Sequence, residues 1–130
     1  MTEPTHIRTP LARVRGRGTA KSGTAHFWHQ RVTAVANIPL TIATVIILII
    51  LLGRNQAAAA QILGSPAIAI IMLLFIFSIT THMRIGMAVI IEDYVHDESA
   101  KLTLLMANTF FTIAVGLAAV YGILKLSFGL

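Results

Sequence analysis

The chain has 130 residues, of which 56% are hydrophobic and only 12% are charged. Soluble domains carry about 25% charged residues, so a soluble globular protein is excluded, and the length leaves room for only one compact unit. The absence of cysteine excludes disulfides and thiolate ligation of zinc or iron–sulfur clusters by this chain. The formal net charge of +5 raises the question of nucleic-acid binding.

Residues 1–24 form a basic arm punctuated by proline and glycine, with too little apolar surface to offset the entropy of ordering. We expect a flexible arm followed by one membrane domain over residues 25–130. Six of the ten lysine and arginine residues precede the first apolar segment. Because cytoplasmic flanks of membrane spans are rich in these residues, the charge indicates orientation and contact with lipid headgroups, and no nucleic-acid partner is expected.

The first apolar segment, residues 32–52, contains no charged residue and predicts a transmembrane helix. Its 21 residues would extend about 31 Å as a helix, close to the roughly 30 Å thickness of the hydrocarbon core. This segment is too long for the apolar core of a cleaved signal peptide. Phe27 and Trp28 precede it, as is typical of a membrane interface.

Two further spans are predicted, over residues 67–91 and 102–126. Residues 57–64 predict a short interfacial helix or loop, and Pro66 suits the first turn of the helix that follows. An acidic segment, residues 92–98, separates the second and third spans and holds four of the five carboxylates. The fold class is therefore an all-α integral membrane protein with three transmembrane helices. Its N-terminus should be cytoplasmic and its C-terminus periplasmic, or on the equivalent sides of the mitochondrial inner membrane.

His82 lies within the second span, about 14 Å from its inner end, where an ionisable side chain is costly and suggests a function. Two interpretations remain open. A neutral imidazole can be buried if it forms a hydrogen bond to threonine or a backbone carbonyl. Alternatively, it can be an axial ligand of haem iron. Gly86 favours the ligand, because it lies on the same helical face and would let a flat macrocycle approach the backbone.

Other polar side chains are expected at the inner end of the spans. Arg31, His26 and His29 can supply cations for haem propionates, and either histidine can take that role. Tyr94 can donate a hydrogen bond to a quinone carbonyl, and Asp93 can orient that hydroxyl or relay a proton. Tyrosine at an interface is also an ordinary membrane anchor, so both interpretations of Tyr94 stay open.

The stretch from His82 to Tyr94 has the pattern H-x3-G-x6-D-Y in the second of three spans. It resembles the smaller cytochrome b anchor subunit of succinate dehydrogenase, the D-type subunit of respiratory complex II. The segment from His26 to Ala34, HFWHQRVTA, is similar to the entry of that family into its first span. The resemblance covers roughly residues 25–125, and the motifs of the other anchor, the C type, are absent.

The resemblance implies a subunit without independent activity. It would pair with a C-type anchor in a helical bundle that holds one haem b, and would attach the iron–sulfur and flavoprotein subunits to the bacterial inner membrane. His82 matches the axial ligand of the haem iron, and Arg31 matches the arginine at the propionates. His26 is ranked weakly above His29 for a second propionate contact. Tyr94, with Asp93 beside it, matches the tyrosine that binds ubiquinone.

Two other functions share part of this pattern. The anchor of a quinol:fumarate reductase would have the same architecture with the opposite electron flow. A structural or small transport subunit without haem would bury His82 as an ordinary polar residue. The absence of a detectable internal repeat argues against a transporter built from inverted halves.

Overall fold

The computed structural model describes residues 22–129 and, before them, Leu11 alone. The described residues form four α-helices and no strand: α2 (Ser22–Leu51), α3 (Gln56–Gly64), α4 (Pro66–Tyr94) and α5 (Glu98–Phe128). The predicted all-α membrane fold is therefore confirmed. Helix α2 includes the last residues of the predicted arm, and the rest of that arm lies outside the described residues.

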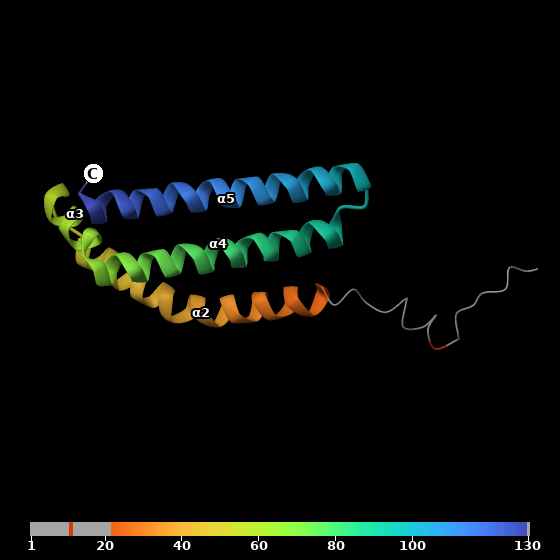
Figure 1. The fold of residues 1–130 in the computed structure, drawn as a ribbon, viewed down its shortest axis with the longest axis horizontal. Coiled ribbons are helices and arrows are strands. Elements are labelled where there is room, and N and C mark those ends of the chain that lie inside the picture. Colours follow the sequence, from red (N-terminus) through yellow and green to blue (C-terminus); the bar gives the residue numbers. More distant parts are fainter. Residues whose placement is uncertain (1–10, 12–21, 130) are drawn as a thin grey trace, which may run out of the picture.

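Helix α4 runs antiparallel to both α2 and α5, as Figure 1 shows, so α2 and α5 point in the same direction. Each of the three is long and apolar enough to cross a membrane. They contain the three predicted spans to within one residue and extend beyond them at the interfaces. Helical turns beyond the predicted spans are expected, because a helix continues to provide hydrogen bonds for the backbone N–H and C=O groups near the membrane surface.

The connections follow the local sequence. The side chain of Asn55 accepts a hydrogen bond of 2.9 Å from the Ala58 N–H and caps α3, so the segment predicted as a helix or loop is a helix. Pro66 occupies the first turn of α4, where its missing N–H is not needed. At the other end of the molecule the side chain of Asp97 caps α5 in the same way.

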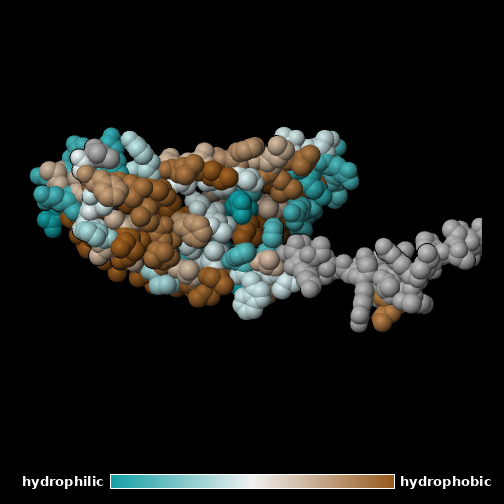
Figure 2. All heavy atoms as spheres, viewed as in Figure 1, coloured by the Kyte–Doolittle hydropathy of each residue, from teal (hydrophilic) through white to brown (hydrophobic). Residues whose placement is uncertain are grey.

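Helix α4 lies between α2 and α5 and packs against both, while α3 packs across α5 and the start of α4 (Figure 1). Six apolar residues are buried among those that the structure describes, so this part of the chain has a small internal core. Apolar side chains dominate the middle of the surface in Figure 2, and hydrophilic residues gather at both ends. Such a surface suits contact with lipid tails, which offer no hydrogen bonds, or van der Waals packing against other membrane helices.

The tightest helix contact is at the end of the molecule where α3 lies. A Cβ atom added at Gly64 would come within 2.6 Å of the Leu126 carbonyl oxygen, so the backbones of α3 and α5 approach too closely for any side chain. Ser127 donates a hydrogen bond of 3.3 Å to the Gly64 carbonyl at the same contact. Glycine is therefore required at this position if α3 is to pack directly against α5.

Candidate functional site

His82 is placed on α4 where that helix packs against α2. Its Nδ1 atom lies 3.1 Å from the Thr33 hydroxyl, within hydrogen-bond distance. Ser78, one turn earlier on α4, donates a longer bond of 3.4 Å to the Thr33 carbonyl. The contact engages one ring nitrogen of His82, and no hydrogen bond to Nε2 is formed within the described part of the chain.

Gly86 follows His82 by one turn and faces the same neighbouring helix. A Cβ atom at Gly86 would meet Nε2 of Gln30 at 3.5 Å, an ordinary van der Waals distance. The Oε1 atom of Gln30 is buried and has no hydrogen-bond partner in the described residues. A buried amide oxygen without a partner is costly, so this part of the α2–α4 contact is polar and incompletely satisfied by the chain itself.

The cationic residues near the start of α2 do not all face the same way. His26 precedes Thr33 by seven residues, close to two helical turns, and so lies on nearly the same face of α2. His29 precedes Thr33 by about one turn and lines a groove together with it. Arg31 lies about 200° around the helix from Thr33. Its guanidinium is exposed and packs 5.1 Å from the centre of the Phe27 ring.

Asp93 and Tyr94 end helix α4, which is continuous from His82 onward. A rise of 1.5 Å per residue places Tyr94 about 18 Å beyond His82 along the helix axis. The Tyr94 side chain is 77% exposed, and Asp93 is also exposed. Neither side chain forms a hydrogen bond within residues 22–129, so both are available to a group outside this chain.

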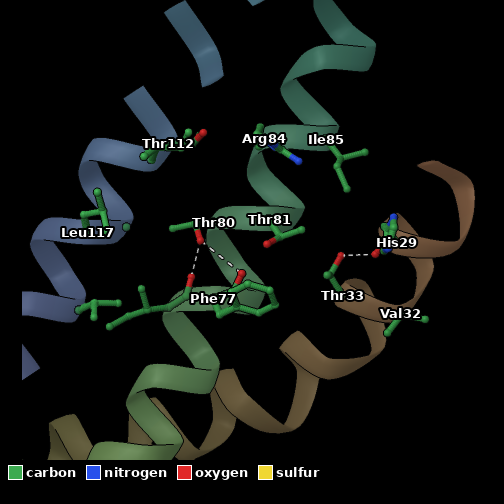
Figure 3. A pocket seen from close by; sticks show the side chains of 14 residues that line it. His29, Val32, Thr33, Phe77, Thr80, Thr81, Arg84, Ile85, Thr112 and Leu117 are labelled. Carbon is green, nitrogen blue, oxygen red and sulfur yellow. Dashed lines mark hydrogen bonds between the residues drawn. The ribbon is translucent and has the colours of Figure 1, made fainter. Parts of the chain in front are cut away.

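A groove of about 680 Å³ crosses α4 between α2 and α5, as Figure 3 shows. Arg84 and His29 line it together with threonines from all three long helices, and apolar side chains such as Phe77 and Leu117 complete its walls. Asn108 on α5 donates a hydrogen bond of 2.9 Å to the Arg84 carbonyl and so joins α4 to α5. Thr33 lines the groove and also contacts His82, so the two features adjoin at the α2–α4 contact.

Sequence reasoning missed Thr33 as the partner of His82, Ser78 as a partner of Thr33, and Gln30 as the neighbour of Gly86. Threonine and serine are frequent in membrane helices, so their presence alone indicates nothing. One available clue is spacing, because Gln30, Thr33 and the buried Thr44 recur at helical intervals along one face of α2. That clue identifies the packed face but not the residue opposite it.

The His82 region can support coordination of a metal-containing cofactor. No group of three or more histidine, cysteine or carboxylate residues that could hold a bare metal ion exists in the described residues. A haem needs only one or two protein ligands, because the macrocycle supplies the other four. The donor set fits a haem, since His82 is an imidazole with one nitrogen held by a neighbour and the other uncommitted.

Fold and site together define a three-span membrane subunit with a histidine inside its second span. The sequence comparisons identify the family. Residues 5–116 match the model of the succinate dehydrogenase/fumarate reductase transmembrane subunit family. The chain belongs to this family and is a membrane-anchor subunit of succinate dehydrogenase of the D type, as the sequence predicted.

Three characterised relatives support this placement. The chain is 31% identical over 121 residues to the succinate dehydrogenase hydrophobic membrane anchor subunit of Paracoccus denitrificans, covering 93% of each chain. It is 29% identical to the subunit of that name in Rickettsia bellii (strain RML369-C), covering 82% of this chain and 86% of the relative. It is 34% identical to the succinate dehydrogenase membrane anchor subunit of Reclinomonas americana, covering 63% and 71%. No solved structure matches the chain.

Proposed function

We propose that this anchor subunit binds haem b together with a second, C-type anchor and contributes to the site where ubiquinone is reduced. The observation that carries the proposal is His82, an intramembrane imidazole whose Nδ1 contacts Thr33 while its Nε2 lacks a partner in the described residues. Ionisable residues inside spans are rare and usually functional. The names of the relatives favour succinate oxidation over fumarate reduction.

His82 would hold the haem iron through Nε2, and a histidine of the partner anchor would provide a second ligand. The described residues contain no other histidine at a comparable depth, so a second axial imidazole must come from elsewhere. When bound between two imidazoles, haem b supplies a one-electron redox centre inside the membrane. The chain's own contribution is to hold the His82 ring in position and to exclude water with the apolar face of α4.

The propionates need cations near the membrane surface, and Arg31 and His26 are our candidates. The register of α2 does not separate His26 from His29, because both lie within about 40° of Thr33 around the helix. His26 keeps its weak preference from the family resemblance. Arg31 is exposed, and its long side chain is free to reach a group on another subunit. Its position away from Thr33 implies that it approaches a propionate around the side of α2.

For ubiquinone, Tyr94 would donate a hydrogen bond from its phenol to a carbonyl oxygen, and Asp93 would orient that hydroxyl or relay a proton. Both residues are exposed at the end of α4, where a lipid-soluble substrate can arrive from the bilayer. The acidic segment beside them lies on the face where the iron–sulfur and flavoprotein subunits would dock. The subunit has no independent activity in this proposal.

The test is purification of the complex in mild detergent from the native membrane. We expect a C-type anchor, an iron–sulfur protein and a flavoprotein to copurify, together with a low-spin haem b signal in the reduced-minus-oxidised spectrum. Copurification without any haem signal would leave the anchor role intact but remove the haem from the proposal. Without an iron–sulfur or flavoprotein partner, the proposed assembly itself would be wrong.

Orientation is proposed from charge, since lysine and arginine concentrate before the first span. We place the subunit in the bacterial inner membrane with the N-terminus cytoplasmic. A reporter fused after Leu130 should then be active only as a periplasmic fusion, with a fusion in the loop after Tyr94 as the cytoplasmic control. A cytoplasmic reading at the C-terminus would reverse the proposed orientation.

A further inference from the structure

The hydrogen bond between Thr33 and His82 is unusual within this molecule. Among the described residues it is the one side chain to side chain hydrogen bond that joins two spanning helices. Thr33 is 9% exposed, so water has little access to compete for this bond. Its position in the α2–α4 contact is reinforced by the bond from Ser78 to its carbonyl.

The protons of this contact can be assigned from the neighbouring acceptors. The Thr33 hydroxyl oxygen lies 2.7 Å from the His29 carbonyl oxygen and 3.2 Å from the Gln30 carbonyl oxygen. Carbonyl oxygens only accept hydrogen bonds, so the single hydroxyl proton of Thr33 is directed to them. The Thr33 oxygen therefore accepts from His82, and Nδ1 of His82 carries the ring proton.

A neutral imidazole with its proton on Nδ1 has its lone pair on Nε2. This is the form that a metal-binding histidine needs, and the partner that holds the other ring nitrogen usually fixes both tautomer and ring orientation. Threonine suits the task because its branched side chain has few rotamers in a helix, and the bond to the carbonyl four residues earlier selects one of them.

We propose that Thr33 is a positioning residue for the haem ligand: it accepts the Nδ1 proton of His82 and so presents Nε2 of that ring to iron. The inference rests on the proposed function, because it requires His82 to be the axial ligand. It adds that the ligand is prepared by this chain alone, across the α2–α4 contact. A hydrogen bond from Nδ1 makes the imidazole a stronger electron donor, which stabilises ferric over ferrous haem.

The test is Thr33→Val in the whole complex, because valine keeps the shape of threonine and removes the hydroxyl. We expect a higher haem b midpoint potential, altered g-values of the ferric low-spin signal and haem retention weakened about 10- to 100-fold. Thr33→Ser restores the acceptor and should restore the wild-type potential. If Thr33→Val prevents assembly, Thr33→Ala measured in native membranes carries the same expectation without the branched side chain.

Thr44→Val is the matched control. Thr44 is buried on the same face of α2, and its hydroxyl has no hydrogen-bond partner in the described residues, so its removal should leave the potential and g-values unchanged. Equal shifts in both valine variants would reveal a general packing effect and overturn the role of Thr33. A wild-type potential in Thr33→Val and Thr33→Ala would also overturn it, while the proposed function would survive. If His82→Leu retained the low-spin haem, the proposed function itself would fail.

Discussion

The two ends of the three-helix bundle formed by α2, α4 and α5 are held together by different kinds of contact. At the α3 end, Ala69, Ile76 and Ile123 form an apolar cluster between α4 and α5, and Gly64 brings α3 against the backbone of α5. Toward the α4–α5 loop, the contact between α2 and α4 is made by polar groups, with the hydrogen bond from Thr33 to His82 among them.

Helix α4 takes part in both contacts, and the difference between them assigns a structural role to its beginning and a functional role to its second half. The α3 end is closed by this chain itself, since its apolar side chains pack and Ser127 donates a hydrogen bond to the Gly64 carbonyl, although the buried Thr44 hydroxyl has no partner among the described residues. The half nearer the α4–α5 loop, called the polar half below, contains the Gln30 amide oxygen and the Nε2 nitrogen of His82. Neither atom has a hydrogen-bond partner among the described residues. Groups of that kind are costly in a membrane, which indicates that something outside the chain completes this half.

The largest expected effect comes from His82→Leu. If the polar half serves the haem, this change should remove nearly all of the low-spin haem b signal while the span still inserts, because leucine is more apolar than histidine. The reduced-minus-oxidised spectrum of purified complex measures it. His96→Leu, in the exposed loop after α4, is the control and should keep the spectrum. An unchanged spectrum in His82→Leu would contradict the proposal that the polar half binds haem.

Gly64→Ala tests the other half. The added methyl group would lie 2.6 Å from the Leu126 carbonyl, so α3 and α5 must move apart, at a cost of about 1–3 kcal/mol typical of overpacking. We expect a lower thermal midpoint for the complex, with an unaltered haem spectrum in the fraction that assembles. Gly122→Ala is the control, because a Cβ there would meet nothing within 4 Å in the described residues. Equal stability of the two variants would contradict the close contact.

The sequence predicts the spans and His82, but it does not predict the contacts between helices in either half. Span positions follow from the thickness of the hydrocarbon core, so the helices agree with expectation, and His82 is conspicuous because an ionisable group in a span is costly. Thr33 and Gly64 could not be found in this way. Their importance depends on which atoms lie opposite them on another helix, and a common residue type gives no sign of that pairing. Helix α2 also begins earlier than the first predicted span, at Ser22, because Phe27 and Trp28 indicate a membrane interface but give no sign that the helix continues through it.

Tyr94→Phe tests whether the exposed end of the polar half binds ubiquinone. If the phenol binds a ubiquinone carbonyl, loss of one hydrogen bond worth about 0.5–1.5 kcal/mol should lower kcat/KM for quinone about 2- to 12-fold. Succinate oxidation with an artificial acceptor that takes electrons from the soluble subunits should not change. Tyr121→Phe, an exposed tyrosine on α5, provides the control. Wild-type quinone kinetics in assembled Tyr94→Phe complex would make Tyr94 an interfacial anchor only.

The smallest expected effect concerns Asp97, which begins α5 next to the polar half but takes no part in the proposed site. Hydrogen bonds from the Ala100 backbone N–H, at 2.7 Å, and from the Ser99 hydroxyl lower the pKa of this carboxyl. A lowered pKa means that the ionised form stabilises the folded state above the unfolded pKa, and that this contribution is lost as pH falls through the folded pKa.

Asp97→Ala should therefore lower the thermal midpoint of the complex slightly at pH 7, and the difference from wild type should shrink as the pH falls from about 4, the ordinary pKa of an aspartate, through the lowered pKa of the folded state. Asp97→Asn keeps a capping oxygen without the charge, so it should fall between the two at pH 7. Because Asp97 is fully exposed, solvent screens its charge and the effect stays small. A change in the haem spectrum of Asp97→Ala would show that the start of α5 is coupled to the His82 region, and the separation of local capping from ligand binding would then be wrong.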